Sequence, residues 1–339
     1  MTNDDMATVI DTSDEWIRTR SGIQERRVSH VPCSDLAAVA GSRALAAAGV
    51  DVAEVDLLIV ATCTPDTIIP STAAHVQRKM GARNSAVFDL NAGCSGFVYS
   101  MTVANSLVRS GVYRKVLVIG AERITWLLNW SLRDTAVLFG DGAGAVVLEP
   151  STKECGLLAS HLGCEGDALE ALLVPNFGTA GNRFVENYPV FDVMFDGREI
   201  FRRAVKGMAQ EIRLVMEELG LQNSDIDLII PHQANERIIQ SLAHHLGVPM
   251  EQVALNISRY GNTSAATIPV ALCEALDEGR IKPGSNLLLA AFGTGLTRGA
   301  GLIRWGDRTA PLGESDAELP PCDQTALEIM SDAIKYTGK

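Results

Sequence analysis

Asn91-Ala92-Gly93-Cys94-Ser95-Gly96-Phe97 is the stretch on which the prediction of the fold depends. Residues 86–90 before it have the composition of a short buried strand, and residues 97–108 after it carry apolar side chains at helical spacing. Cys94 is therefore predicted to lie on a glycine-flanked turn between a strand and a helix, where a ligand can approach closely. The positive end of a helix lowers the pKa of a thiol, and the thiolate is the nucleophilic form. A buried structural cysteine is the alternative, so a nucleophile needs support from other residues.

The composition excludes several classes of protein. The 339 residues, 47% of them hydrophobic, are enough for two domains or one large duplicated domain. A net charge of −12 argues against nucleic acid or a membrane surface as a partner. Seven cysteines without metal-ligand spacing indicate free thiols and no metal site. Because no apolar run reaches about 18 residues, we expect a cytoplasmic protein.

The two halves of the chain repeat the same order of apolar segments. Repetition at this scale indicates a duplicated α/β fold, in which each half has a mostly parallel sheet covered on both faces. Functional residues are expected where the carboxyl ends of the strands of the two halves meet. The matching segments are 55–60 and 226–231, 86–96 and 253–264, 115–119 and 286–290, and 142–146 and 299–303.

The glycines of residues 140–144 superficially resemble a dinucleotide-binding loop. Such a loop follows a strand and opens a helix, whereas these glycines introduce an apolar strand. We therefore predict close packing of the chain there and no nucleotide site.

Three predicted strand ends carry residues with useful chemistry. Cys94 ends a strand of the first half, His232 ends one of the second half, and Asn262 follows the next. Each alone has an ordinary explanation, since a histidine beside a strand is usually a satisfied polar residue and Gly-Asn is usually a turn. Together they suit covalent catalysis on thioesters, with a thiolate nucleophile and two groups that stabilise an enolate-like oxygen.

Two further features fit either a structural or a binding role. Trp16 with Arg20 is either a packing detail or a platform for a planar ligand. The predicted helix 198–219 has an apolar face and, beside it, a basic stripe that is either a solvated surface or a site for an anionic partner. The stripe contains Arg198, Arg202, Lys206 and Arg213.

Five motifs in this order resemble β-ketoacyl-acyl-carrier-protein synthase III, a condensing enzyme of the thiolase-like superfamily. The resemblance implies a five-layered αβαβα fold of two duplicated halves with mixed, mostly parallel sheets, and a homodimer. We expect halves at residues 1–150 and 151–306 and an extension at 307–339. The motifs are Asp11-Thr12-Ser13-Asp14-Glu15-Trp16-Ile17, residues 91–97 and 139–144, Pro231-His232-Gln233-Ala234-Asn235, and Tyr260-Gly261-Asn262-Thr263-Ser264-Ala265.

The same resemblance implies the reaction. Cys94 takes an acyl group from acyl-CoA, malonyl-acyl-carrier protein loses CO₂, and the carbanion attacks the acyl-enzyme to start type II fatty acid synthesis. His232 and Asn262 would stabilise the enolate, and the backbone N–H groups of Cys94 and Thr294 would form the oxyanion hole. Thr294 stands where the family commonly has glycine. Coenzyme A enters only as the substrate thioester, and no cofactor is implied.

The resemblance also implies binding roles. Trp16 and Arg133 match positions that sandwich the adenine of CoA, and Arg20 matches one near its phosphates. Arg202 and Arg237 match basic positions for docking of the carrier protein. Ile69 stands where some members place an aromatic residue that reaches into the partner's acyl pocket. Because isoleucine is smaller, we expect a pocket longer than an acetyl-selective one.

The two ends of the chain depart from the family pattern. In the family each half opens with a strand, which we expect at the centre of its sheet. The segment that would form this strand in the first half is absent here. Its loss would leave a gap beside residues 55–61, so the natural protein is expected to begin earlier, with Met1 as an internal methionine. At the other end, a helix capped by Asp323 and running through Lys335 is expected to dock on the body or the dimer.

Three rival interpretations differ in chemistry. A related condensing enzyme joins two acyl-CoAs or loads the starter of a secondary metabolite. An α/β hydrolase with a cysteine nucleophile requires Gly-x-Cys-x-Gly, but Ala92 occupies the first position. A non-catalytic paralogue would tolerate the loss of Cys94, His232 or Asn262, and all three are present.

Overall fold

The computed structural model describes residues 1–175, 178–179 and 193–338 of the chain. Two four-stranded sheets form its frame. The first has the order β2-β1-β3-β4 and the second β5-β10-β9-β8. The strands are β1 Leu57–Ala61, β2 Ala86–Leu90, β3 Val116–Arg123, β4 Asp141–Leu148, β5 Gly156–Cys164, β8 Leu228–Pro231, β9 Asn286–Gly293 and β10 Thr297–Arg304.

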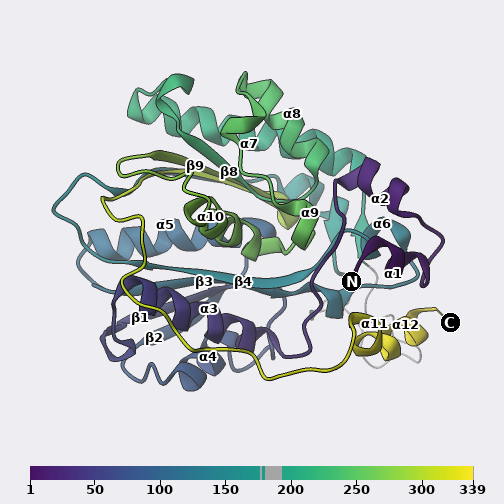
Figure 1. The fold of residues 1–339 in the computed structure, drawn as a ribbon. Coiled ribbons are helices and arrows are strands. Elements are labelled where there is room, and N and C mark those ends of the chain that lie inside the picture. Colours follow the sequence, from purple (N-terminus) through teal and green to yellow (C-terminus); the bar gives the residue numbers. More distant parts are fainter. Residues whose placement is uncertain (176–177, 180–192, 339) are drawn as a thin grey trace.

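Helices cover both sheets and also lie between them, which gives five layers (Figure 1). One outer layer contains α3 and α4, the central layer α5 and α10, and the other outer layer α7 and α8. This is the predicted thiolase-like αβαβα arrangement. The six helices are α3 Cys33–Ala48, α4 Thr72–Met80, α5 Gly96–Arg109, α7 Gly197–Leu219, α8 Glu236–Leu246 and α10 Thr267–Asp277.

Smaller elements complete the structure around one end of the sheets. They are α1 Asn3–Ala7, α2 Asp14–Ser21, α6 Arg133–Ala136, β6 Leu172–Leu173, β7 Met194–Phe195, α9 Ile257–Tyr260, α11 Ala326–Ile329 and α12 Ser331–Thr337. Within the described ranges, no helix is long and apolar enough to cross a membrane.

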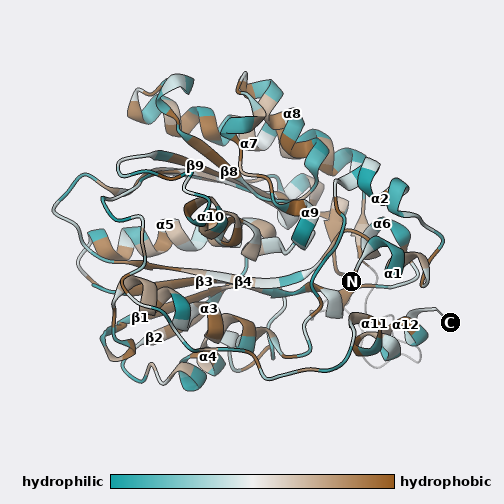
Figure 2. Cartoon of the chain, viewed as in Figure 1, coloured by the Kyte–Doolittle hydropathy of each residue, from teal (hydrophilic) through white to brown (hydrophobic). Residues whose placement is uncertain are grey.

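The central strands are apolar on both sides because helices cover both faces of each sheet. All five residues of β1 and the first seven of β3 are buried. Hydrophobic residues line the strands, whereas the outer helices α7 and α8 alternate between hydrophobic and hydrophilic residues (Figure 2). The sequence pattern of these segments follows directly from this layering.

Close packing explains the glycines of residues 140–144. A Cβ on Gly140 would lie 2.5 Å from the carbonyl oxygen of Tyr260, and one on Gly144 would lie 2.8 Å from Cβ of Pro269. These contacts leave no room for a side chain, so the glycines serve packing, as predicted.

Two strand predictions need correction. Residues 86–90 form a strand, but β2 lies at an edge of its sheet, and two of its side chains are exposed rather than buried. Residues 253–256, expected to repeat that strand, contribute only one isolated bridge, between Ile229 and Val253. Both segments are apolar, as a buried strand would be, but the sequence does not show how many neighbouring strands each one pairs with.

The predicted central position of the opening strand is wrong. In the second half the opening strand is β5, which pairs antiparallel with β10 and lies at the edge of the sheet. In the first half β1 is hydrogen-bonded to β2 on one side and to β3 on the other. The described structure therefore has no gap beside residues 55–61, because the backbone groups there are paired.

The C-terminal extension packs along the first half. The backbone N–H of Leu312 donates to the carbonyl oxygen of Ala47, and Arg43 donates to the carbonyl oxygen of Ala317. The predicted helix 323–335 is instead two short helices, α11 and α12. Its cap is Thr325 rather than Asp323, because Thr325 and Glu328 form a reciprocal capping box.

The extension ends in a hydrophobic contact. Met330, between α11 and α12, is 5% exposed and packs in a cluster with Met6, Ile17 and Trp130. The extension is thus fastened at its far end by side-chain burial as well as by hydrogen bonds along α3.

We expect Met330→Ala to lower the free energy of unfolding by about 2 kcal/mol or more, because it removes a buried side chain and leaves a cavity. Tyr336→Ala is the matched control, since Tyr336 is 65% exposed on the same segment and should change stability by less than about 0.5 kcal/mol. Thermal melting monitored by circular dichroism measures both. Equal melting temperatures for Met330→Ala and the unmodified chain would show that the extension is not fastened there.

Candidate active site

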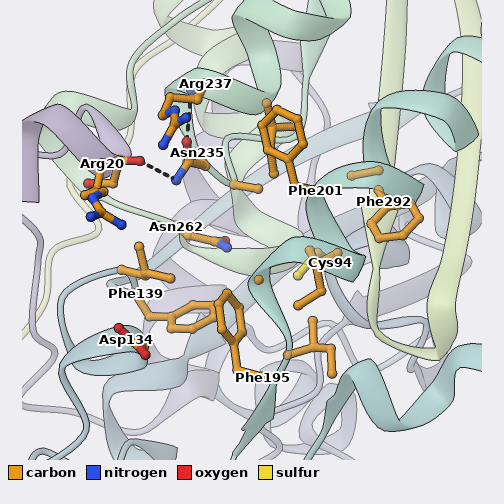
Figure 3. Close-up of a pocket in the computed structure, with 18 of the residues that line it drawn as sticks. Arg20, Cys94, Asp134, Phe139, Phe195, Phe201, Asn235, Arg237, Asn262 and Phe292 are labelled. Carbon is orange, nitrogen blue, oxygen red and sulfur yellow. Dashed lines mark hydrogen bonds between the residues drawn. The ribbon is translucent and has the colours of Figure 1, made fainter.

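One cavity of about 980 Å³ contains the three residues expected to form the catalytic triad. Cys94, His232 and Asn262 all line it and are nearly inaccessible to solvent. They come from the turn before α5, the end of β8 and the segment before α10, so the duplicated halves contribute together. Figure 3 shows Cys94 and the side-chain amide of Asn262 facing the same space.

Two backbone segments meet beside Cys94. Gly93, with φ 54°, and Gly293 lie where the two halves touch. A Cβ on Gly93 would be 3.0 Å from the backbone nitrogen of Thr294, and one on Gly293 would be 2.7 Å from the backbone nitrogen of Cys94. The two predicted oxyanion donors, Cys94 and Thr294, are therefore on adjoining backbone segments that only glycine neighbours allow to approach so closely.

The thiol of Cys94 does not have the lowered pKa that the sequence suggested. Burial raises the pKa of Cys94 to about 11, the nearby Ser264 side chain opposes the rise, and the Glu122 carboxylate adds to it. Desolvation outweighs the helix end here, because the cavity removes water from the charged thiolate. At neutral pH the thiol is therefore protonated, and a nucleophilic role would require the loss of its proton.

His232 is held at both its backbone and its ring. Its backbone N–H donates to the carbonyl oxygen of Ala290, and its Nδ1 lies 2.7 Å from Oγ1 of Thr267. Burial lowers the pKa of His232 to about 3, so the imidazole is neutral at physiological pH. Since Nδ1 is engaged with Thr267, Nε2 is the nitrogen available to the cavity.

Asn262 is oriented by its own turn. The backbone N–H of Asn262 donates to the carbonyl oxygen of Leu138, and its side-chain Oδ1 accepts from the backbone N–H of Ser264 at 2.8 Å. With the oxygen bound in this way, the planar amide presents its NH₂ group on the opposite side. The amide is therefore available to the cavity as a hydrogen-bond donor.

The structure brings Trp16, Arg20 and Arg133 together at one side of the cavity. The guanidinium of Arg133 stacks on the Trp16 ring at 4.3 Å from the ring centre, and that of Arg20 lies at 5.3 Å. Trp16 and Arg20 line the cavity. Because Arg133 and Trp16 are already in contact, a planar ring can enter between them only if they separate.

The predicted docking residues differ in position. Arg237 lines the cavity, and its backbone N–H donates to Asn235, whose amide also donates to the carbonyl oxygen of Arg20 (Figure 3). Arg202 is exposed on α7, outside the cavity lining, and pairs with Glu199 at 2.7 Å. Arg198, on the same basic stripe, does line the cavity. Its position in the stripe was the only signal that could have identified it.

Ile69 also lies apart from this cavity. Its side chain is 86% exposed, and it is not among the lining residues. The apolar wall of the cavity includes Phe195, Phe201 and Phe292 (Figure 3). In the sequence these were indistinguishable from core residues, because helix and strand periodicity does not separate a core from a cavity wall.

The cysteine side chains are free thiols. All seven cysteines are unpaired. Across residues 1–175, 178–179 and 193–338, no group of three histidine, cysteine or acidic side chains is arranged to hold a metal ion.

Comparisons with known proteins agree with this geometry. The family description "3-Oxoacyl-[acyl-carrier-protein (ACP)] synthase III" matches residues 88–166, and its C-terminal counterpart matches residues 216–305. "Beta-ketoacyl-[acyl-carrier-protein] synthase III 2" of Vibrio cholerae is 54% identical over 336 residues, which are 99% of this chain and 93% of that protein.

Solved structures give the same result. The crystal structure of 3-oxoacyl-[acyl-carrier-protein] synthase III from Aquifex aeolicus matches with a TM-score of 0.85 and 44% identity, covering 90% of this chain and 95% of that one. The priming β-ketosynthase of the R1128 polyketide pathway matches with a TM-score of 0.85 and 35% identity, covering 91% and 92%. The chain belongs to the β-ketoacyl-acyl-carrier-protein synthase III family.

Proposed function

We propose that this chain condenses an acyl-CoA with malonyl-acyl-carrier protein, with loss of CO₂, to give the β-ketoacyl-carrier protein that begins type II fatty acid synthesis. Membership of the family supports the reaction. The observation that carries it is the convergence of Cys94, His232 and Asn262 on one cavity. The catalytic roles of these three residues are part of the proposal.

In the first half-reaction, Sγ of Cys94 attacks the thioester carbonyl of acyl-CoA. The thiol proton leaves, the C–S bond to CoA breaks, and CoA departs as the thiol. The tetrahedral oxyanion is within the reach of backbone donors, since Cys94 and Thr294 lie on touching segments. Trp16, Arg20 and Arg133 at the cavity edge would hold the adenine and phosphates of CoA.

In the second half-reaction, the malonyl group loses CO₂ and leaves an enolate. The NH₂ group of Asn262 and the imidazole of His232 stabilise the enolate oxygen by hydrogen bonds. The carbanion then attacks the acyl-Cys94 carbonyl and releases the thiolate, which regains a proton. Because His232 is neutral, it acts here as a hydrogen-bond donor rather than as a cation.

Surface features support two partners. Arg198 and Arg237 at the cavity mouth, with Arg202 beside them, form a basic area that suits an acidic carrier protein. The exposed Ile68 and Ile69 and the half-exposed β2 edge strand suit a homodimer, since apolar side chains and unpaired strand edges are usually covered.

Seven free thiols support a reducing compartment, the cytoplasm.

A condensing enzyme that uses two acyl-CoAs or loads a secondary-metabolite starter is the alternative in the same fold, and the similarity to β-ketoacyl-acyl-carrier-protein synthases III does not favour it. The second substrate discriminates between them. We expect malonyl-carrier protein to react with acylated chain faster than malonyl-CoA or a plain acyl-CoA, and preference for a plain acyl-CoA would favour the alternative.

Substitutions of the three triad residues should affect the two half-reactions differently. Cys94→Ser is expected to abolish acyl-enzyme formation, whereas Asn262→Ala and His232→Ala should largely spare it and lower condensation by about 10²–10³-fold, because each removes a donor to the enolate. Intact-protein mass measures acylation, and release of labelled CO₂ measures condensation. Full condensation by either alanine variant would remove that residue from the mechanism.

The basic residues Arg202 and Arg237 are expected to bind the carrier protein and to have little effect on the reaction with acyl-CoA. The double variant Arg202→Glu/Arg237→Glu is expected to raise KM for malonyl-carrier protein about tenfold or more at low salt, with a smaller effect at high salt. Acylation by acyl-CoA should change little. Arg114→Glu is the control, since Arg114 is exposed outside the cavity lining. An equal loss in both half-reactions would contradict docking.

Chain length tests the expectation for Ile69. We expect acyl-CoAs longer than acetyl to acylate Cys94, and Ile69→Phe to shift the preference towards shorter chains because a ring fills more of the partner's pocket. The mass of the Cys94 peptide after incubation with acyl-CoAs of graded length gives the answer. Acylation by acetyl-CoA alone would disprove the expectation.

A further inference from the structure

Thr267 is a buried residue whose hydroxyl lies between two possible partners. It begins α10, and its Oγ1 lies 2.7 Å from Nδ1 of His232 and 2.9 Å from the carbonyl oxygen of Ser264. A hydroxyl has a single proton to donate. The partner that receives this proton decides which nitrogen of His232 carries the ring hydrogen.

The carbonyl of Ser264 does not depend on that hydroxyl. It already accepts the backbone N–H of Thr267 in the turn that leads into α10. Nδ1 of His232, by contrast, has the Thr267 hydroxyl as its hydrogen-bond partner in a side chain that is almost fully buried. The hydroxyl proton can therefore go to Nδ1 without leaving the carbonyl unsatisfied.

Ser264 holds this arrangement rigid. It has a left-handed backbone conformation with φ 50°, uncommon for a residue other than glycine. Its hydroxyl donates to Oε1 of Glu122 at 2.9 Å, and its N–H donates to Oδ1 of Asn262 at 2.8 Å. Glu122 is fully buried and also accepts from the backbone N–H groups of Cys63 and Thr64.

One buried network thus reaches both groups proposed to meet the enolate. From Ser264, one bond orients the amide of Asn262, and the first turn of α10 carries Thr267 to the ring of His232. Only the tautomer with hydrogen on Nε2 can donate from a neutral imidazole into the cavity while Nδ1 faces Thr267.

We propose that Thr267 is a positioning residue: its hydroxyl donates to Nδ1 of His232 and thereby keeps the imidazole in the Nε2–H tautomer that donates to the enolate. This inference rests on the proposed condensation. Thr267 itself does not contact the substrate. Ser264 and Glu122 hold the turn that positions the Thr267 hydroxyl.

The proton positions test the proposal without any activity measurement. Neutron diffraction from crystals of the perdeuterated full chain should show deuterium on Nε2 of His232 and the Thr267 deuteroxyl directed at Nδ1. Deuterium on Nδ1, with the deuteroxyl directed at Ser264, would overturn it. Since this readout needs no substrate, it stands or falls separately from the proposed function.

Two variants provide the kinetic test. Thr267→Val keeps the shape and removes the hydroxyl, and we expect condensation to fall by about a hundredfold while acylation of Cys94 stays within about twofold, because only the second half-reaction uses the donor. Thr267→Ser retains the hydroxyl and should restore most of the condensation rate.

Melting temperatures show whether the variants fold. Loss of both half-reactions in a folded Thr267→Val variant, or a condensation rate equal to that of the unmodified chain, would contradict the proposal. If Thr267→Val does not fold, failure of Thr267→Ser to condense at close to the unmodified rate would contradict it instead.

Discussion

The contact between the turn at Gly93 and the turn at Gly293 is the constraint on which the site depends. A Cβ on Gly293 would lie 2.7 Å from the backbone nitrogen of Cys94, closer than side chains come, and one on Gly93 would lie 3.0 Å from that of Thr294. Because the two segments belong to different halves, this contact also fixes how the halves are set against each other at the cavity. The positions of Cys94 and of the predicted oxyanion donors follow from this close approach of two backbone segments.

Burial gives the site its electrostatic character. The thiol of Cys94 and the imidazole of His232 are both held in their neutral forms, because removal of water penalises each charged form. Neutral side chains at Cys94 and His232 suit chemistry in which negative charge appears only during the reaction. Fixed donors such as the Asn262 amide then need no reorganisation when that charge develops.

Periodicity and duplication predicted two α/β halves with functional residues where they meet, and the resemblance to the family supplied the five-layered arrangement. Cys94 and His232 do follow strands, whereas the segment before Asn262 forms only one isolated bridge. Pairing at sheet edges could not be predicted in this way, as the positions of β2 and β5 show, since an edge strand and a central strand have similar apolar composition. The raised pKa of Cys94 was also missed. The sequence shows that a helix follows the thiol but not how much water its surroundings exclude.

The stacking of Arg133 on Trp16 means that the adenine site expected there is occupied by the protein itself before any ligand arrives. A planar ring that binds there must therefore compete with an internal cation, and its apparent affinity is its intrinsic affinity multiplied by the fraction of molecules in which the pair is open. If CoA binds between these residues as proposed, the same stacking would reform once it leaves. The closed pair would then favour release of CoA after the acyl group has moved to Cys94.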